Sequence, residues 1–171
     1  VDGGLVGVRI PLLAIDAVDK IENQDLKIAT LARERGAGRI VDANKWDLVE
    51  KDDKTAAHFT KESQEKAPFL RFVPFLFTSA VTGQRVTRVL DLLLEVDAER
   101  QKRISTSQVN ARLGEFVARL QPPQAAGREV KVLYATQVQV APPTIAVFGN
   151  HPELIEEHYL RYLHNGFRDA W

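Results

Sequence analysis

Short apolar runs alternate with longer amphipathic stretches over the first hundred residues, and this alternation limits the possible folds more than any other feature. The apolar runs have the composition of buried strands and occupy residues 8–16, 39–43 and 72–77. The other stretches have helical periodicity and occupy residues 24–35, residues 53–66 and a segment that opens at Gly83, with Val86, Val89, Leu90, Leu93 and Leu94 as its apolar face. Strand–helix–strand repeats give parallel strands joined by right-handed crossovers, so we predict an α/β fold.

The pattern changes near residue 101, where a polar linker begins. A helix, two strands and a last helix are expected at residues 107–121, 130–140, 144–148 and from 152 onward. The first of these strands is predicted from an alternating set of Val130, Val132, Tyr134, Thr136, Val138 and Val140. A two-stranded sheet is marginal by itself, so we expect a third strand after Trp171. The sequence thus predicts two domains, 1–100 and 101–171, the second a small α+β domain that lacks its last strand.

The charge of the chain is balanced overall but uneven along its length. With 23 basic and 23 acidic residues, it is not a wholly basic nucleic-acid coat. Residues 1–100 carry a net charge of −2 and residues 101–171 carry +2, and the stretch from Arg100 to Lys131 carries +5. Such a stretch can attract phosphate, although a solvated linker and helix face would have the same composition.

Several function classes are excluded or disfavoured. The chain has no cysteine, so it forms no disulfides and performs no thiol chemistry. No apolar run is long enough to span a membrane and no signal peptide is visible, and we expect a cytoplasmic protein. The spacing of His151, His158 and His164 does not favour a metal site.

The segment Asn44-Lys45-Trp46-Asp47 carries the clearest chemical signal, because it directly follows a buried strand. Guanine presents two adjacent donors, its ring N–H and its exocyclic amine, and one carboxylate such as Asp47 can accept both. Adenine lacks this donor pair, so the carboxylate discriminates between the purines. The aliphatic stem of Lys45 can lie over the base, and the Asn44 amide can hold both the loop and the base.

Ser79-Ala80 follows the next buried strand and is the second element of the predicted site. A small residue permits close backbone approach, and a backbone N–H there can donate to the guanine carbonyl. In a parallel sheet ligands bind at the carboxyl ends of the strands, where both segments fall. Ordinary loop capping by Asn, Asp and Ser is the alternative explanation for both segments.

The residues resemble the bacterial tandem GTPase family known as EngA or Der over positions 8 to 168. Its second G domain is similar at Asp16-Ala17, Gln24-Asp25-Leu26-Lys27-Ile28-Ala29, Asn44-Lys45-Trp46-Asp47 and Phe77-Thr78-Ser79-Ala80. Its C-terminal KH-like domain is similar at residues 128–137, 142–150 and 159–165. The chain departs from the family at Lys20 and Glu22, and Val41-Asp42-Ala43 interrupts a strand that is usually more apolar.

This resemblance implies a partial P-loop GTPase-type sheet followed by a KH-like domain. It implies guanine-base binding by Asn44, Lys45, Asp47, Ser79 and Ala80. It also implies a full-length protein with an upstream G domain that hydrolyses GTP with Mg²⁺ and a monovalent cation, and that acts in maturation of the large ribosomal subunit. No segment fits G-x-x-x-x-G-K-[ST], so no catalytic residue and no cation ligand carries over. We therefore expect these residues alone to have no GTPase activity.

The KH-like resemblance does not extend to RNA readout, because the chain has no GXXG loop. Phosphates of rRNA could still be contacted by Arg112, Arg119, Arg128 and Lys131. Packing against another domain is the competing use of these side chains.

Two other interpretations stay open from the sequence. The chain could be a nucleotide-independent RNA or protein interaction module, whose binding would survive loss of Asp47. It could also be an unrelated flavodoxin-like α/β enzyme with chance motifs.

Overall fold

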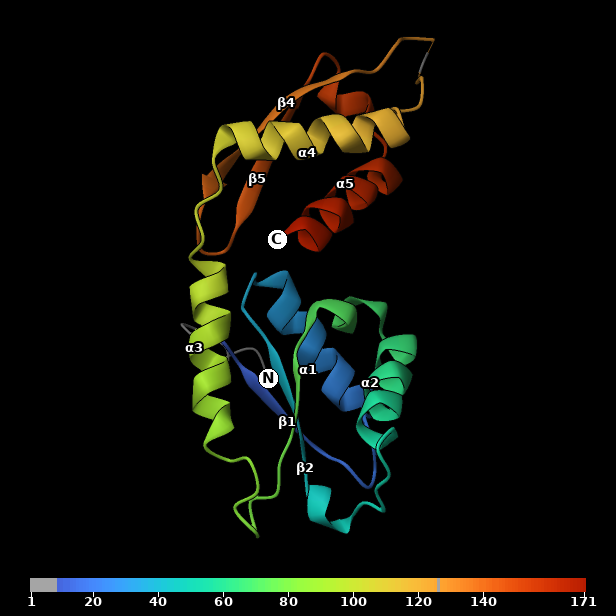
Figure 1. Cartoon of the computed structure of the whole chain (residues 1–171). Coiled ribbons are helices and arrows are strands. Elements are labelled where there is room, and N and C mark those ends of the chain that lie inside the picture. The colour runs from blue at the N-terminus through green and yellow to red at the C-terminus, as the bar shows by residue number, and fades with distance from the viewer. Residues whose placement is uncertain (1–8, 126) are drawn as a thin grey trace. The chain divides into compact units, whose positions relative to one another are not determined.

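The chain divides into two compact units, with the boundary between Arg100 and Gln101 (Figure 1). The computed structural model describes residues 9–125 and 127–171, so the predicted start of the first strand at Val8 lies outside the described residues. Each unit has its own cluster of buried apolar side chains. None of the helices in the described ranges has the length and apolar content that a membrane crossing requires.

The first unit contains a three-stranded parallel sheet in the order β1-β2-β3. Its elements are β1 (Leu12–Asp16), α1 (Asn23–Glu34), β2 (Ile40–Asn44), a 3₁₀ turn η2 (Trp46–Leu48), α2 (Thr55–Lys66), a second 3₁₀ turn η3 (Pro68–Phe72), β3 (Phe75–Phe77) and α3 (Arg88–Arg100). Figure 1 shows α1 and α2 on one side of this sheet and α3 on the other. The α/β fold with a parallel sheet and flanking helices is therefore confirmed.

The core of the first unit lies between the sheet and the helices α1 and α2. Ala29 and Ala32 of α1 are buried, so this helix presents a flat surface to the strands. Trp46 packs against Phe77 and Phe59, with ring centroids 4.4 and 6.0 Å apart. Trp46 is thus a packing residue, and it fixes the segment that follows β2 to the core.

The last helix of this unit differs from its prediction. It begins at Arg88 instead of Gly83, because Gly83 and Arg85 both have positive φ and the backbone of Ser79 pairs with that of Gln84. The chain therefore forms a turn before the helix starts. Two residues of the predicted apolar face, Leu90 and Leu94, are exposed on α3.

The second unit consists of an antiparallel strand pair covered by two helices. Its elements are α4 (Thr106–Arg119), β4 (Val132–Gln139), β5 (Thr144–Gly149), a 3₁₀ turn η4 (Pro152–Leu154) and α5 (Glu157–Ala170). Its core side chains come from both helices and from β4, and they are Val109, Leu113, Phe116, Ala135, Tyr159, Leu163 and Phe167. The predicted small α+β region is confirmed.

The buried face of β4 is the reverse of the one that the valine alternation suggests. Ala135 and Gln137 are buried, whereas Tyr134 and Val138 are exposed. Gln137 is stable in the interior because its amide accepts from the Ile104 N–H and donates to a backbone carbonyl. An irregularity in the β4–β5 register between residues 132 and 134 shifts the alternation along the strand.

A side chain of α4 occupies part of the outer edge of β4. The amide oxygen of Asn110 accepts the Ala135 N–H at 2.9 Å, and its amide nitrogen donates to the Ala135 carbonyl at 2.8 Å. Asn110 thus completes the backbone hydrogen bonding of an edge strand that would otherwise need solvent or another strand.

Candidate nucleotide-binding site

The segments after β2 and β3 are joined by backbone hydrogen bonds at the carboxyl edge of the sheet. The Thr78 N–H donates to the Ala43 carbonyl at 3.1 Å, and the Trp46 N–H donates to the Thr78 carbonyl at 2.9 Å. Asn44 to Asp47 and Ser79-Ala80 therefore lie side by side, as the strand order predicts.

Asn44 connects the two segments through its side chain. Its amide oxygen accepts the Lys45 N–H at 2.6 Å and the Ala80 N–H at 3.2 Å. Ala80 as a residue is exposed, and its N–H is the one that Asn44 holds. The backbone donor that we expect to bind the guanine carbonyl is thus aligned by Asn44.

Ser79 has a supporting position in the site. Ser79 is fully buried, its N–H donates to the Gln84 carbonyl, and its hydroxyl accepts the Thr82 N–H at 3.1 Å. These contacts hold the turn that presents Ala80. The Ser79 hydroxyl is therefore committed to the fold.

Asp47 has a carboxylate oxygen that no group in the described residues satisfies. It lies in the 3₁₀ turn η2, and its Oδ1 atom is buried without a hydrogen-bond partner. A buried carboxylate oxygen without a donor is costly, which makes such an atom a candidate for binding a ligand donor.

Lys45 is held across the edge of the sheet by an acid from the neighbouring strand. Its backbone is left-handed, with φ 60°, and its ammonium group pairs with the Asp16 carboxylate at the end of β1. The hydrogen bond from Lys45, followed by that from the Val18 N–H, lowers the pKa of Asp16, and the same pair raises the pKa of Lys45. Both groups are therefore charged near neutral pH.

Three residues of this region were not predicted as site residues: Asp16, Asp42 and Thr78. In the sequence, Asp16 was visible only as the acid at the end of the first apolar run and as part of a resembling segment. Asp42 was visible only as an interruption of an apolar strand, and Thr78 only as part of a resembling segment. Their contacts join residues 29 and 36 positions apart, which local sequence patterns do not encode.

The four candidate phosphate contacts lie in the second unit and differ in their ion pairing. Arg112 pairs with Glu115 and Lys131 pairs with Glu129, each at 2.9 Å. Arg119, in the last turn of α4, and Arg128 are exposed. Exposed ion pairs contribute little, so a phosphate can compete for all four cations.

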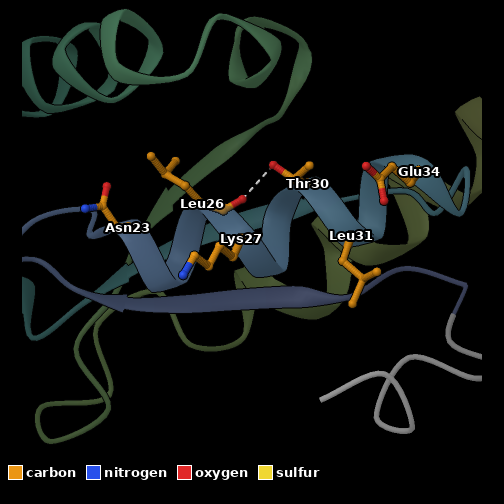
Figure 2. A pocket seen from close by; sticks show the side chains of 6 residues that line it. All are labelled: Asn23, Leu26, Lys27, Thr30, Leu31 and Glu34. Carbon is orange, nitrogen blue, oxygen red and sulfur yellow. Dashed lines mark hydrogen bonds between the residues drawn. The ribbon is translucent and has the colours of Figure 1, made fainter.

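In the first unit, a shallow groove of about 460 Å³ follows α1 (Figure 2). All six of its lining residues belong to this one helix: Asn23, Leu26, Lys27, Thr30, Leu31 and Glu34. The Thr30 hydroxyl donates to the Leu26 carbonyl within the helix at 2.8 Å. The polar groups of the groove do not converge on a common point, so we assign no ligand to it.

Two protein families match the two units. The model of the elongation factor Tu GTP-binding domain matches residues 1–99, and that of the KH-domain-like C-terminal region of EngA bacterial GTPase enzymes matches residues 103–171. The fold and these matches define a domain of the GTP-binding class joined to a KH-like domain.

Individual relatives agree with both matches. GTPase Der of Gemmatimonas aurantiaca is 65% identical over 161 residues, which are 94% of this chain and 37% of that protein. GTPase Der of Desulfitobacterium hafniense is 46% identical over 160 residues, 94% of this chain and 36% of that protein. A crystal structure of Aquifex aeolicus Era is 16% identical, with a TM-score of 0.49 over 99% of this chain and 62% of that chain. The chain belongs to the EngA/Der family of bacterial GTPases, and it spans a little over a third of the length of these curated relatives.

Proposed function

We propose that this chain is the guanine-recognition and KH-like part of a GTP-hydrolysing protein that acts in large-subunit ribosome assembly. Asn44, Lys45, Asp47, Ser79 and Ala80 form its base-binding site. Asp47 accepts the guanine ring N–H and exocyclic amine, Ala80 donates its backbone N–H to the guanine carbonyl, and the Lys45 stem covers the base. Asn44 and Ser79 hold the two segments in place.

The observation that carries this proposal is the buried Asp47 Oδ1 atom, which has no hydrogen-bond partner among the described residues and lies in a turn that is bonded to the segment after β3. Guanine would supply a donor to this atom, and its carbonyl would share the Ala80 N–H with Asn44. The alternative of plain loop capping does not explain this atom, because a capping carboxylate accepts backbone N–H groups.

The test exchanges the donor and acceptor pattern of residue 47 in the full-length protein. Asp47→Asn replaces one carboxylate oxygen by an amide donor. Xanthine has a carbonyl in place of the exocyclic amine of guanine, so the amide donor matches xanthine better. We expect GDP affinity to fall about tenfold or more and the affinity for xanthosine diphosphate to rise. Asp53→Asn removes the same charge at an exposed position nearby and is the matched control. Unchanged base preference in Asp47→Asn would show that Asp47 does not contact the base.

GTP hydrolysis belongs in this proposal to the full-length protein. Phosphoryl transfer depends on a phosphate cradle, and no phosphate-loop segment occurs in the sequence. We assign Mg²⁺ and the monovalent cation to other residues of the full-length protein, and we expect the chain alone to turn over no GTP.

The KH-like unit is proposed to contact rRNA through Arg112, Arg119, Arg128 and Lys131. The support is the +5 stretch and the exposure of Arg119 and Arg128. Arg119→Gln combined with Arg128→Gln should weaken binding to a large-subunit rRNA fragment and reduce the slope of log affinity against log salt by about 1 to 2. An unchanged slope would favour the use of these side chains against another domain.

A further inference from the structure

The middle strand of the first unit contains a buried acid at a position where its neighbours are apolar. Asp42 lies on β2, paired in register with Ala14 of β1 and Leu76 of β3. It is only 4% exposed, and Val41 and Ala43 beside it are buried. A carboxyl group at such a position is unfavourable unless a specific contact compensates for the lost hydration.

The compensating contact comes from the end of the next strand. The Thr78 hydroxyl lies 2.8 Å from Oδ1 of Asp42 and 3.0 Å from Oδ2, and Thr78 is 1% exposed. The hydroxyl donates its single proton to one of these oxygens at a time. This buried hydrogen bond thus links β2 to the residue that follows β3, in a part of the unit from which water is excluded.

The same threonine is bound to both sides of the candidate site through its backbone. Its N–H donates to the carbonyl of Ala43, and its carbonyl accepts the N–H of Trp46, directly before Asp47. Its next neighbours along the chain are Ser79 and Ala80. Any shift of Thr78 therefore moves Ala80 relative to Asp47.

We propose that Asp42 is a positioning residue for guanine recognition, which acts through the Thr78 hydroxyl to fix the separation between Asp47 and the Ala80 N–H. This inference rests on the proposed function, because it concerns the residues assigned to the base. Recognition of two donors and one acceptor on a rigid ring depends on the relative placement of the groups that bind them. Asp42 does not itself contact the nucleotide.

The hydrogen bond between Asp42 and Thr78 can be removed without leaving an unpaired polar group in the core. Asp42→Val leaves the Thr78 hydroxyl without its acceptor, and Thr78→Val leaves the Asp42 carboxyl without its donor. The double variant Asp42→Val/Thr78→Val replaces both by apolar groups, which can be nearly neutral for stability. Thr78→Ser keeps the hydroxyl and is the conservative variant.

The readout is base discrimination in the full-length protein, measured as the ratio of dissociation constants for inosine diphosphate and GDP. Inosine lacks the exocyclic amine, so the ratio reports the contact of Asp47 with that group. A lower folded fraction weakens both nucleotides equally and leaves the ratio unchanged. We expect the double variant to lower the ratio about tenfold and Thr78→Ser to keep it within about twofold of the wild type.

The matched control is Thr30→Val, which removes a threonine hydroxyl bound within α1 and should leave the ratio unchanged. A double variant with wild-type discrimination would overturn the positioning role of Asp42. This outcome is distinct from failure of the proposed function, which Asp47→Asn tests separately. If Asp47→Asn alters base preference and the double variant does not alter the ratio, only the role of Asp42 is refuted.

Discussion

The Lys45 ammonium group and the Asp16 carboxylate form an ion pair that joins the segment after β2 to the end of β1. Asp16 is itself held by the Val18 N–H, which donates to its other oxygen at 2.9 Å. The pair therefore restrains a long side chain whose aliphatic stem is proposed to cover the base.

Asp16→Asn should weaken guanine nucleotide binding in the full-length protein without abolishing it. The variant removes the charge that holds Lys45, whose side chain is more than half exposed. Exposed pairs contribute at most about 1 kcal/mol, so we expect a loss of about two- to fivefold in GDP affinity, measured by titration calorimetry. Glu62→Gln disrupts a similar pair with Lys20 elsewhere in the unit and should leave GDP affinity unchanged. Equal effects of the two variants would argue against a role for Asp16 in nucleotide binding.

The order of the elements and the meeting of the segments after β2 and β3 could be predicted from the sequence, because both follow from local patterns. Apolar runs and helical periodicity identify β1, α1, β2, α2 and β3, and parallel strands bring Asn44 and Ala80 to one edge. The start of α3 and the buried face of β4 could not be predicted in this way. They depend on the turn at Gly83 and on a buried Gln137 that finds backbone partners far away in sequence.

The buried carboxyl group of Asp42 should make the free energy of unfolding decrease as the pH rises. Burial raises the pKa of Asp42 above its ordinary value of 3.8, and the hydrogen bond from Thr78 opposes this shift only in part. Between the two values the folded state holds a proton that the unfolded state has released. The free energy of unfolding contributed by this group is therefore fully present below pH 3.8 and falls as the pH rises through the raised pKa.

Asp42→Asn should remove this pH dependence. Urea unfolding from about pH 4 to about pH 8 should show the wild type losing stability relative to the variant, by about 1.4 kcal/mol for each unit by which the pKa is raised. Asp52→Asn is the control, because hydrogen bonds from Thr55 and the Lys54 N–H lower the pKa of Asp52. The contribution of Asp52 to stability is lost only as the pH falls below 3.8, so this variant should run nearly parallel to the wild type over the measured range. Parallel curves for the wild type and Asp42→Asn would contradict the assignment.

Two glycines of the second unit should respond to alanine in opposite directions. A Cβ atom on Gly149 would lie 2.7 Å from the Lys131 carbonyl oxygen, which is backbone and has little room to move. Gly149→Ala should therefore destabilise the unit by about 1 to 3 kcal/mol. A Cβ atom on Gly114 in α4 meets nothing within 4 Å, so Gly114→Ala should stabilise the helix by about 0.5 to 1 kcal/mol. Thermal unfolding of both variants tests these two predictions. Midpoints that shift in the same direction in Gly149→Ala and Gly114→Ala would contradict them.

The contact of Asn110 with Ala135 closes part of the outer edge of β4 to pairing with another strand. A chain that approaches β4 from outside finds both backbone groups of Ala135 already taken by the amide, and α4 would have to release Asn110 before pairing could start. The helix α4 therefore protects this part of the β4 edge against pairing with an extended segment, whether from this protein or from another.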